Sequence, residues 1–192
     1  MSNSSGRKMH EQGVALFRQE AYPAALEKFE EALGNADDSR HSAEIYNDIG
    51  VTQTRLENYG AAHLALDEAM ARFTELEDQK GQAQTLGNRA ALYQAEELLD
   101  DAVEAYKQSA ALFEQAGENE MAMYVWQAVS RVRMKQGRHI EAIGAYEEGV
   151  DNMPKGSFKR TVLQKILRMP GTLLGTGSSA SDEPDEDEDE ED

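Results

Sequence analysis

The chain repeats a short pattern of residues at a nearly constant spacing, and this repetition limits its fold more than any other feature. Each copy has a small residue near the middle of one expected helix, then an alanine and a large residue in the next. The small residues lie 37, 40 and 40 positions apart and are Gly13, Gly50, Ala90 and Ser130. The pairs of alanine and large residue are Ala25 and Phe29, Ala62 and Leu66, Ala102 and Tyr106, and Ala142 and Tyr146. Such a spacing is typical of arrays built from helix pairs.

Small side chains at these positions allow the two helices of a pair to approach closely, and the large residue one turn later fills the remaining space. A single pair cannot bury its apolar side alone, so successive pairs have to stack against one another. A four-helix bundle could use similar amphipathic helices. Repetition at a fixed spacing favours an open, all-α solenoid over that alternative.

The repeats resemble those of the tetratricopeptide (TPR) family, in which a helix with the pattern W-x2-L-G-x2-Y is followed by one with A-x3-F and a terminal proline. The resemblance covers residues 6–154 and is strongest over 86–93, which read LGNRAALY. The usual unit has about 34 residues, and the longer unit here is similar to a subgroup found in cell-polarity and bacterial regulatory scaffolds. The resemblance implies a right-handed α-solenoid of four TPR helix pairs plus a C-terminal capping helix. The chain departs from the pattern at Leu16, Gln53, Ser109 and Gly149.

Composition divides the chain into four parts. Residues 1–7 are polar and are expected to be disordered, and the solenoid is expected over 8–154. A basic amphipathic helix over 155–169 is expected to cap the last repeat. Residues 170–192, rich in Gly and Ser and then in acid, are expected to form a disordered tail. Helix stop signals predict helices over 8–20, 22–33, 41–56, 59–77, 80–96, 99–115, 119–136 and 139–152.

Charge and cysteine content restrict the function and the compartment. The net charge of the 192-residue chain is −18, and residues 182–192 supply ten acidic side chains and no basic one. Because phosphates require a basic face, nucleic acid is not expected as a partner. The sequence has no cysteine, which excludes disulfides and thiolate metal sites. No apolar run is long enough to span a membrane, so a cytoplasmic location is expected.

No residue pattern indicates catalysis. The histidines His10, His41, His63 and His139 lie on different predicted helices and lack the i,i+4 pairing of a metal site. The glycine-rich segment 171–177 lacks the Lys-Ser/Thr pair that grips phosphate. We therefore expect no metal, no cofactor and no enzyme activity.

The resemblance implies that the first helix of each pair lines a concave face to which partners bind. Carried over position by position, the expected partner-binding residues are His10, Val14, Arg18, Asn47, Val51, Arg55, Asn88, Ala91, Gln94, Tyr124, Gln127, Arg131 and Lys135. The amides can pair with the backbone of an extended peptide, and the basic residues favour an acidic or carboxylate-bearing segment. Members of the family that grip chaperone tails use a Lys/Asn/Asn/Lys/Arg set, which is largely missing here, so chaperone tails are not expected as ligands.

The sequence thus predicts a scaffold or adaptor that binds a segment of another protein along its concave face. A second hypothesis is a peripheral membrane or complex-assembly factor that docks through the basic C-terminal helix. A third is a chaperone-like protein whose acidic tail captures basic partners. The same tail could instead fold back on the basic helix or on the basic end of the groove. Oligomeric state is left open.

Overall fold

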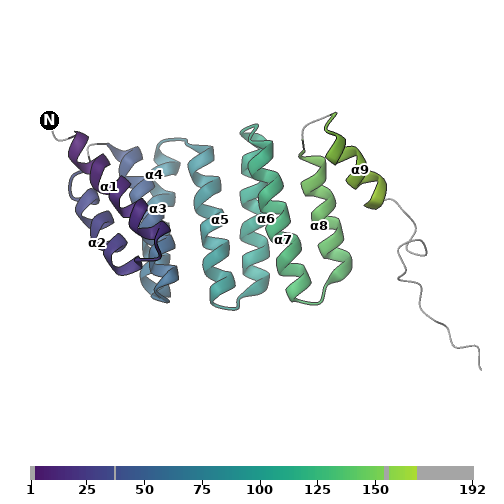
Figure 1. Cartoon of the computed structure of the whole chain (residues 1–192), viewed down its shortest axis with the longest axis horizontal. Helices are drawn as coiled ribbons and strands as arrows, with labels where there is room; N and C mark the ends of the chain where they lie inside the picture. The colour runs from purple at the N-terminus through teal and green to yellow at the C-terminus, as the bar shows by residue number, and fades with distance from the viewer. Residues whose placement is uncertain (1–2, 37, 154–155, 168–192) are drawn as a thin grey trace, which may run out of the picture.

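The computed structural model describes residues 3–36, 38–153 and 156–167, and within these ranges the chain forms nine α-helices and no strand (Figure 1). The helices are α1 (Asn3–Arg18), α2 (Tyr22–Leu33), α3 (Ser39–Arg55), α4 (Tyr59–Glu75), α5 (Gln79–Ala95), α6 (Leu99–Gln115), α7 (Asn119–Lys135), α8 (His139–Asp151) and α9 (Phe158–Leu167).

The first eight helices form four pairs that stack in a row (Figure 1). Each second helix packs against its own partner and against the first helix of the following pair, as α4 does with α3 and α5. The first helices also contact one another, α1 with α3 and α3 with α5. The closer approach of the first helices places them on the inner side of the array. The prediction of an all-α TPR-like solenoid with an additional C-terminal helix is confirmed.

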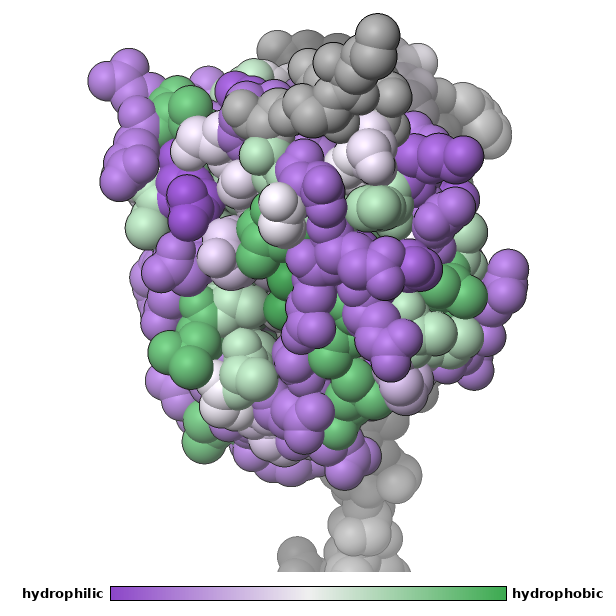
Figure 2. All heavy atoms as spheres, turned by 90° about the vertical axis from the view of Figure 1, so that its left-hand side faces the viewer, coloured by the Kyte–Doolittle hydropathy of each residue, from purple (hydrophilic) through white to green (hydrophobic). Residues whose placement is uncertain are grey.

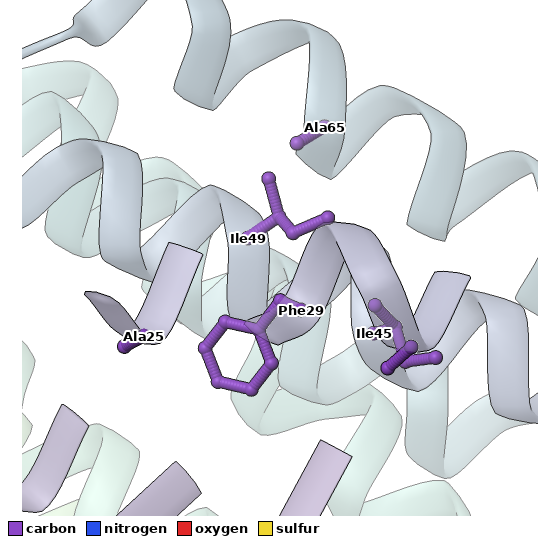
Figure 3. Close-up of a cluster of buried hydrophobic side chains, with 6 residues drawn as sticks. Ala25, Phe29, Ile45, Ile49 and Ala65 are labelled. Atoms are coloured by element: carbon purple, nitrogen blue, oxygen red, sulfur yellow. The ribbon is translucent and has the colours of Figure 1, made fainter. Parts of the chain in front are cut away.

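The small residues of the repeat are required by close helix contacts. Gly13 faces Phe29 of its own pair, where an added Cβ would lie 2.6 Å from the ring. Gly50 faces Leu66 in the same way, again at 2.6 Å. Phe29 then packs with side chains from α2, α3 and α4 in one buried cluster (Figure 3). A larger residue at either glycine would therefore push the two helices of the pair apart.

The N-terminus differs from the prediction. Residues 1–7 were expected to be disordered, and this is wrong for residues 3–7, because α1 begins at Asn3. Gly6 is buried, and a Cβ at this position would collide with the backbone of Asn35 at the end of α2. Packing against α2 thus extends the helix through a segment whose polar composition disfavours it.

The C-terminal end of the array is only partly covered. Arg160 of α9 donates to the carbonyl oxygen of Met153 at 2.8 Å and pairs with Asp151 of α8. The start of α8 stays open, with Ile140 87% exposed and Ile143 52% exposed. The expected tail, 170–192, lies outside the described residues, and the expected domain boundaries stay predictions.

Candidate partner-binding groove

Three adjoining hollows lie along the inner helices, and we call them together the groove. The central hollow has a volume of about 540 Å³ and extends from His10 on α1 across α3 and α5 to Val125 on α7. A second hollow, of about 320 Å³, lies between α3 and α5 around Arg55 and Ala91. A narrow cleft between α1 and α3 joins them, since it shares Asp48 with the first hollow and Val51 with the second.

The groove brings together expected binding residues from the first three pairs. His10, Asn47 and Asn88 line the central hollow. Val51, Arg55 and Ala91 line the second hollow, to which Asn88 also contributes. Val14 lines the cleft. These residues come from helices that begin about 40 positions apart, so the repeat itself places them side by side.

The remaining expected residues lie outside the three hollows. Lys135 forms an ion pair with Glu97 at 2.8 Å, and the hydroxyl of Tyr124 donates to Glu120 at 3.3 Å. Gln127 sits beside Gly149 at the contact between α7 and α8. Arg18, Gln94 and Arg131 also line none of the three hollows. In the fourth pair Val125 lines the groove instead.

Several lining residues were not expected. Glu44 lies one turn before Asn47, and Gln84 lies one turn before Asn88. Extending each expected set by one helical turn toward the N-terminus would have found both residues. Phe73 and Phe113 come from the second helices α4 and α6, yet both line the hollow between the first helices. Their contribution depends on how successive pairs stack, which the repeat pattern alone does not specify.

A pair of histidines links α1 to α3 through side-chain contacts at the edge of the groove. His10 Nε2 lies 2.7 Å from Asp48 Oδ2, and its Nδ1 lies 3.2 Å from His41 Nε2. His41 is 1% exposed, and its backbone N–H donates to Asp38 at the start of α3. Burial, followed by the charges of His10 and Arg7, lowers the pKa of His41. Within the described ranges no group of three candidate ligand side chains is arranged to hold a metal ion.

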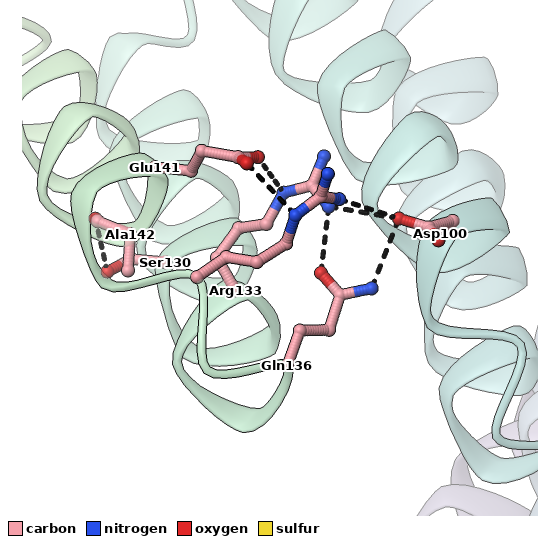
Figure 4. A network of polar contacts seen from close by, with 7 residues as sticks. Asp100, Ser130, Arg133, Gln136, Glu141 and Ala142 are labelled. Atoms are coloured by element: carbon pink, nitrogen blue, oxygen red, sulfur yellow. Dashed lines mark hydrogen bonds and ion pairs between the residues drawn. The ribbon is translucent and has the colours of Figure 1, made fainter.

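Polar contacts outside the groove also join successive pairs. Arg40 of α3 pairs with Asp78, and Lys80 of α5 pairs with Glu118 at 2.7 Å, so equivalent charges join successive pairs. Further along, Asp100 accepts hydrogen bonds from Arg133 and Gln136 at 3.0 and 3.1 Å (Figure 4). These hydrogen bonds, with that from Gln136 contributing most, lower the pKa of Asp100.

The N-terminal end face has a different character from the groove. Polar side chains separate the apolar ones over most of the coloured surface of this face (Figure 2). The surface is therefore suited to contact with water rather than to continuation of the stack. Among the described helices, none is long and apolar enough to cross a lipid bilayer.

Residues 19–167 match the family model described as soluble NSF attachment protein, SNAP. None of the curated proteins matches the chain.

Solved structures share the arrangement of helices at low identity. Aspartyl phosphate phosphatase F from Bacillus subtilis superposes with a TM-score of 0.75 at 12% identity, over 88% of this chain and 45% of the phosphatase. The chain thus spans less than half the length of that protein. A Podosopora anserina protein with nearly identical TPR-like repeats, described as a kinesin light chain, gives 0.66 at 17% identity, over 86% and 84% of the two chains. BtubC (BKLC) from P. vanneervenii gives 0.64 at 11% identity, over 99% and 89%. At these identities the likeness shows the fold alone.

Proposed function

Because the chain belongs to the soluble NSF attachment protein family, we propose that it is a non-enzymatic scaffold that holds a segment of a partner protein in its groove. One observation carries the proposal. The hollows on α1, α3 and α5 share lining residues and so form one continuous surface. A surface of this length fits an extended or helical segment better than it fits a small molecule.

The polar groups of the groove support a peptide ligand. Asn47 and Asn88 both line the central hollow, and each amide can donate and accept hydrogen bonds. The side-chain oxygen of Asn47 is buried and accepts no hydrogen bond within the described part of the chain. Since an unpaired buried acceptor is costly, a backbone N–H from a ligand would stabilise this position. The cysteine-free sequence suits a reducing compartment, so the cytoplasm is part of the proposal.

The C-terminal helix is better explained as a cap than as a membrane anchor. The side chain of Arg160 is 18% exposed, and its donors are used by Met153 and Asp151. Gln164 also donates to Asp151, at 2.7 Å. These contacts hold α9 on α8 and leave Arg160 poorly placed to meet anionic lipid.

Site-specific photo-crosslinking tests the proposal. A benzoylphenylalanine at Ala91, which is exposed in the groove, should crosslink a discrete partner in extract of the source cells. The matched probe at Ala111, exposed on the second helix α6, should not capture that partner. Adding Asn47→Ala and Asn88→Ala should weaken the Ala91 product. Equal products from both probes, or no effect of the double substitution, would contradict a groove ligand.

A further inference from the structure

We infer that the central hollow binds a lysine or arginine side chain of the partner segment. The inference rests on the proposed function and names the chemistry that the groove selects.

The floor of the hollow is apolar. Phe73 and Phe113 reach it from the second helices, and Ala83 and Val125 complete it from α5 and α7. A long aliphatic stem can lie along such a floor while its polar head stays at the rim. Lysine and arginine are the side chains that combine a stem of this kind with a cationic head.

The rim of the hollow is rich in acceptors. Glu44 and Asp48 stand one turn apart on α3, and both line the hollow. Asn47, between them in sequence, also lines the hollow and carries a further acceptor in its amide group. Carboxylates only accept hydrogen bonds, whereas ammonium and guanidinium groups only donate them. The rim and a basic head group are therefore complementary.

The described part of the chain places no lysine or arginine against Glu44 and Asp48 in the central hollow. The residues that line the central hollow include no lysine and no arginine. Asp48 meets His10, but a carboxylate has further acceptor positions. The nearby basic residues are used elsewhere, Arg7 by Asp38 and Arg40 by Asp78. Like charges at positions i and i+4 of a helix repel, so an incoming cation also relieves the repulsion between Glu44 and Asp48.

This inference revises the acidic partner expected from the sequence. Of the basic residues on which that expectation rested, only Arg55 lines the groove. It stands seven residues beyond Asp48, or about 10 Å along α3. An acidic side chain would thus find one partner at the second hollow, whereas the larger central hollow would repel it.

Selection from a displayed peptide library tests the inference. Random twelve-residue peptides are selected on the full chain, and those that crosslink to a benzoylphenylalanine probe at Ala91 are sequenced. We expect a Lys or Arg with apolar neighbours in the enriched set. Replacing that basic residue with Met should weaken binding about tenfold or more, as expected for loss of a close charge pair.

The protein variants give the reciprocal test. The double variant Glu44→Gln, Asp48→Asn should bind the enriched peptides about tenfold more weakly or worse. The control variant Glu27→Gln, Glu30→Gln removes two exposed carboxylates from α2 and should bind as the unsubstituted chain does. Circular dichroism and thermal unfolding verify that both variants are folded. Peptides that crosslink at Ala91 without a basic residue, and that ignore the double variant, would overturn the inference while leaving the proposed function intact. If no peptide crosslinks at Ala91, the proposed function fails as well.

Discussion

At the scale of single residues, four glutamates occupy backbone conformations that glycine adopts more easily. Glu20, Glu57, Glu77 and Glu97 have φ between 52° and 63°. They follow the C-termini of α1, α3, α4 and α5, where the chain must turn to end each helix. Gly117 and Gly137 stand in the same place after α6 and α7. The left-handed conformation costs a residue with a Cβ about 1–2 kcal/mol.

Replacing Glu77 with glycine should therefore stabilise the protein. Glycine removes the left-handed backbone strain of about 1–2 kcal/mol, but its extra flexibility in the unfolded chain costs about 0.5–1 kcal/mol. We therefore expect the free energy of unfolding to rise by about 0.5–1 kcal/mol. Urea denaturation measures the free energy of unfolding. The control is Ala71→Gly, at an exposed position inside α4, which should lose about 1 kcal/mol. Loss of stability in both variants would show that the turn does not favour glycine.

His41 makes the stability depend on pH. Burial, with the charges of His10 and Arg7, holds the pKa of His41 below its ordinary value of 6.5. The unfolded chain therefore takes up a proton at this site before the folded chain does. The stabilisation of the folded chain by neutral His41 is complete above pH 6.5. It is lost as the pH falls toward the lowered pKa. The melting temperature should drop between pH 7.5 and 5.5, and the drop should be smaller in His41→Gln. Parallel curves for the two proteins would exclude this role.

At the scale of helices, the repeat pattern predicts most elements and fails where contacts are not repeated. The predicted helix over 59–77 corresponds to α4, which ends at Glu75, and stop signals located the other internal helices similarly. The predicted first helix began at residue 8 and missed residues 3–7, where Gly6 packs against Asn35 in a contact that no other repeat has. Contacts that occur only once have no periodic signal in the sequence.

Equivalent positions on α6 and α8 should contribute differently to the free energy of unfolding. Val103 is 1% exposed because α7 covers it, with Val129 and Val132 in the same cluster. Ile143 stands 40 positions later at the open end. Val103→Ala should cost about 2 kcal/mol in the free energy of unfolding. Ile143→Ala should cost less than half as much, although it deletes more carbon. Comparable losses in urea denaturation would mean that another part of the molecule covers Ile143.

At the scale of the whole molecule, the groove is only partly predictable from the sequence. Residues such as Asn88, which point inward from one helix, follow from the register of the repeat. The floor residues Phe73 and Phe113 do not, because they reach the groove from the second helices through the stacking of pairs. The register also does not say which charged residues of a first helix reach the groove. Arg131 and Lys135 lie on a first helix but outside the hollows, whereas Glu44 lies inside.

A stacked array should also unfold locally, since among the described helices each pair contacts only its neighbours. Gly13→Leu would place a large side chain against Phe29 and separate α1 from α2. Amide hydrogen exchange in these two helices should accelerate at least about tenfold, because each 1.4 kcal/mol of lost local stability is a tenfold change in opening. Helices α7 and α8, three pairs away, should keep their protection. A substitution in the middle of the array, Ala90→Leu, should instead accelerate exchange in the pairs on both sides of it. Uniform acceleration by Gly13→Leu would show that the chain unfolds as one cooperative unit, and the groove would then open or close as a whole.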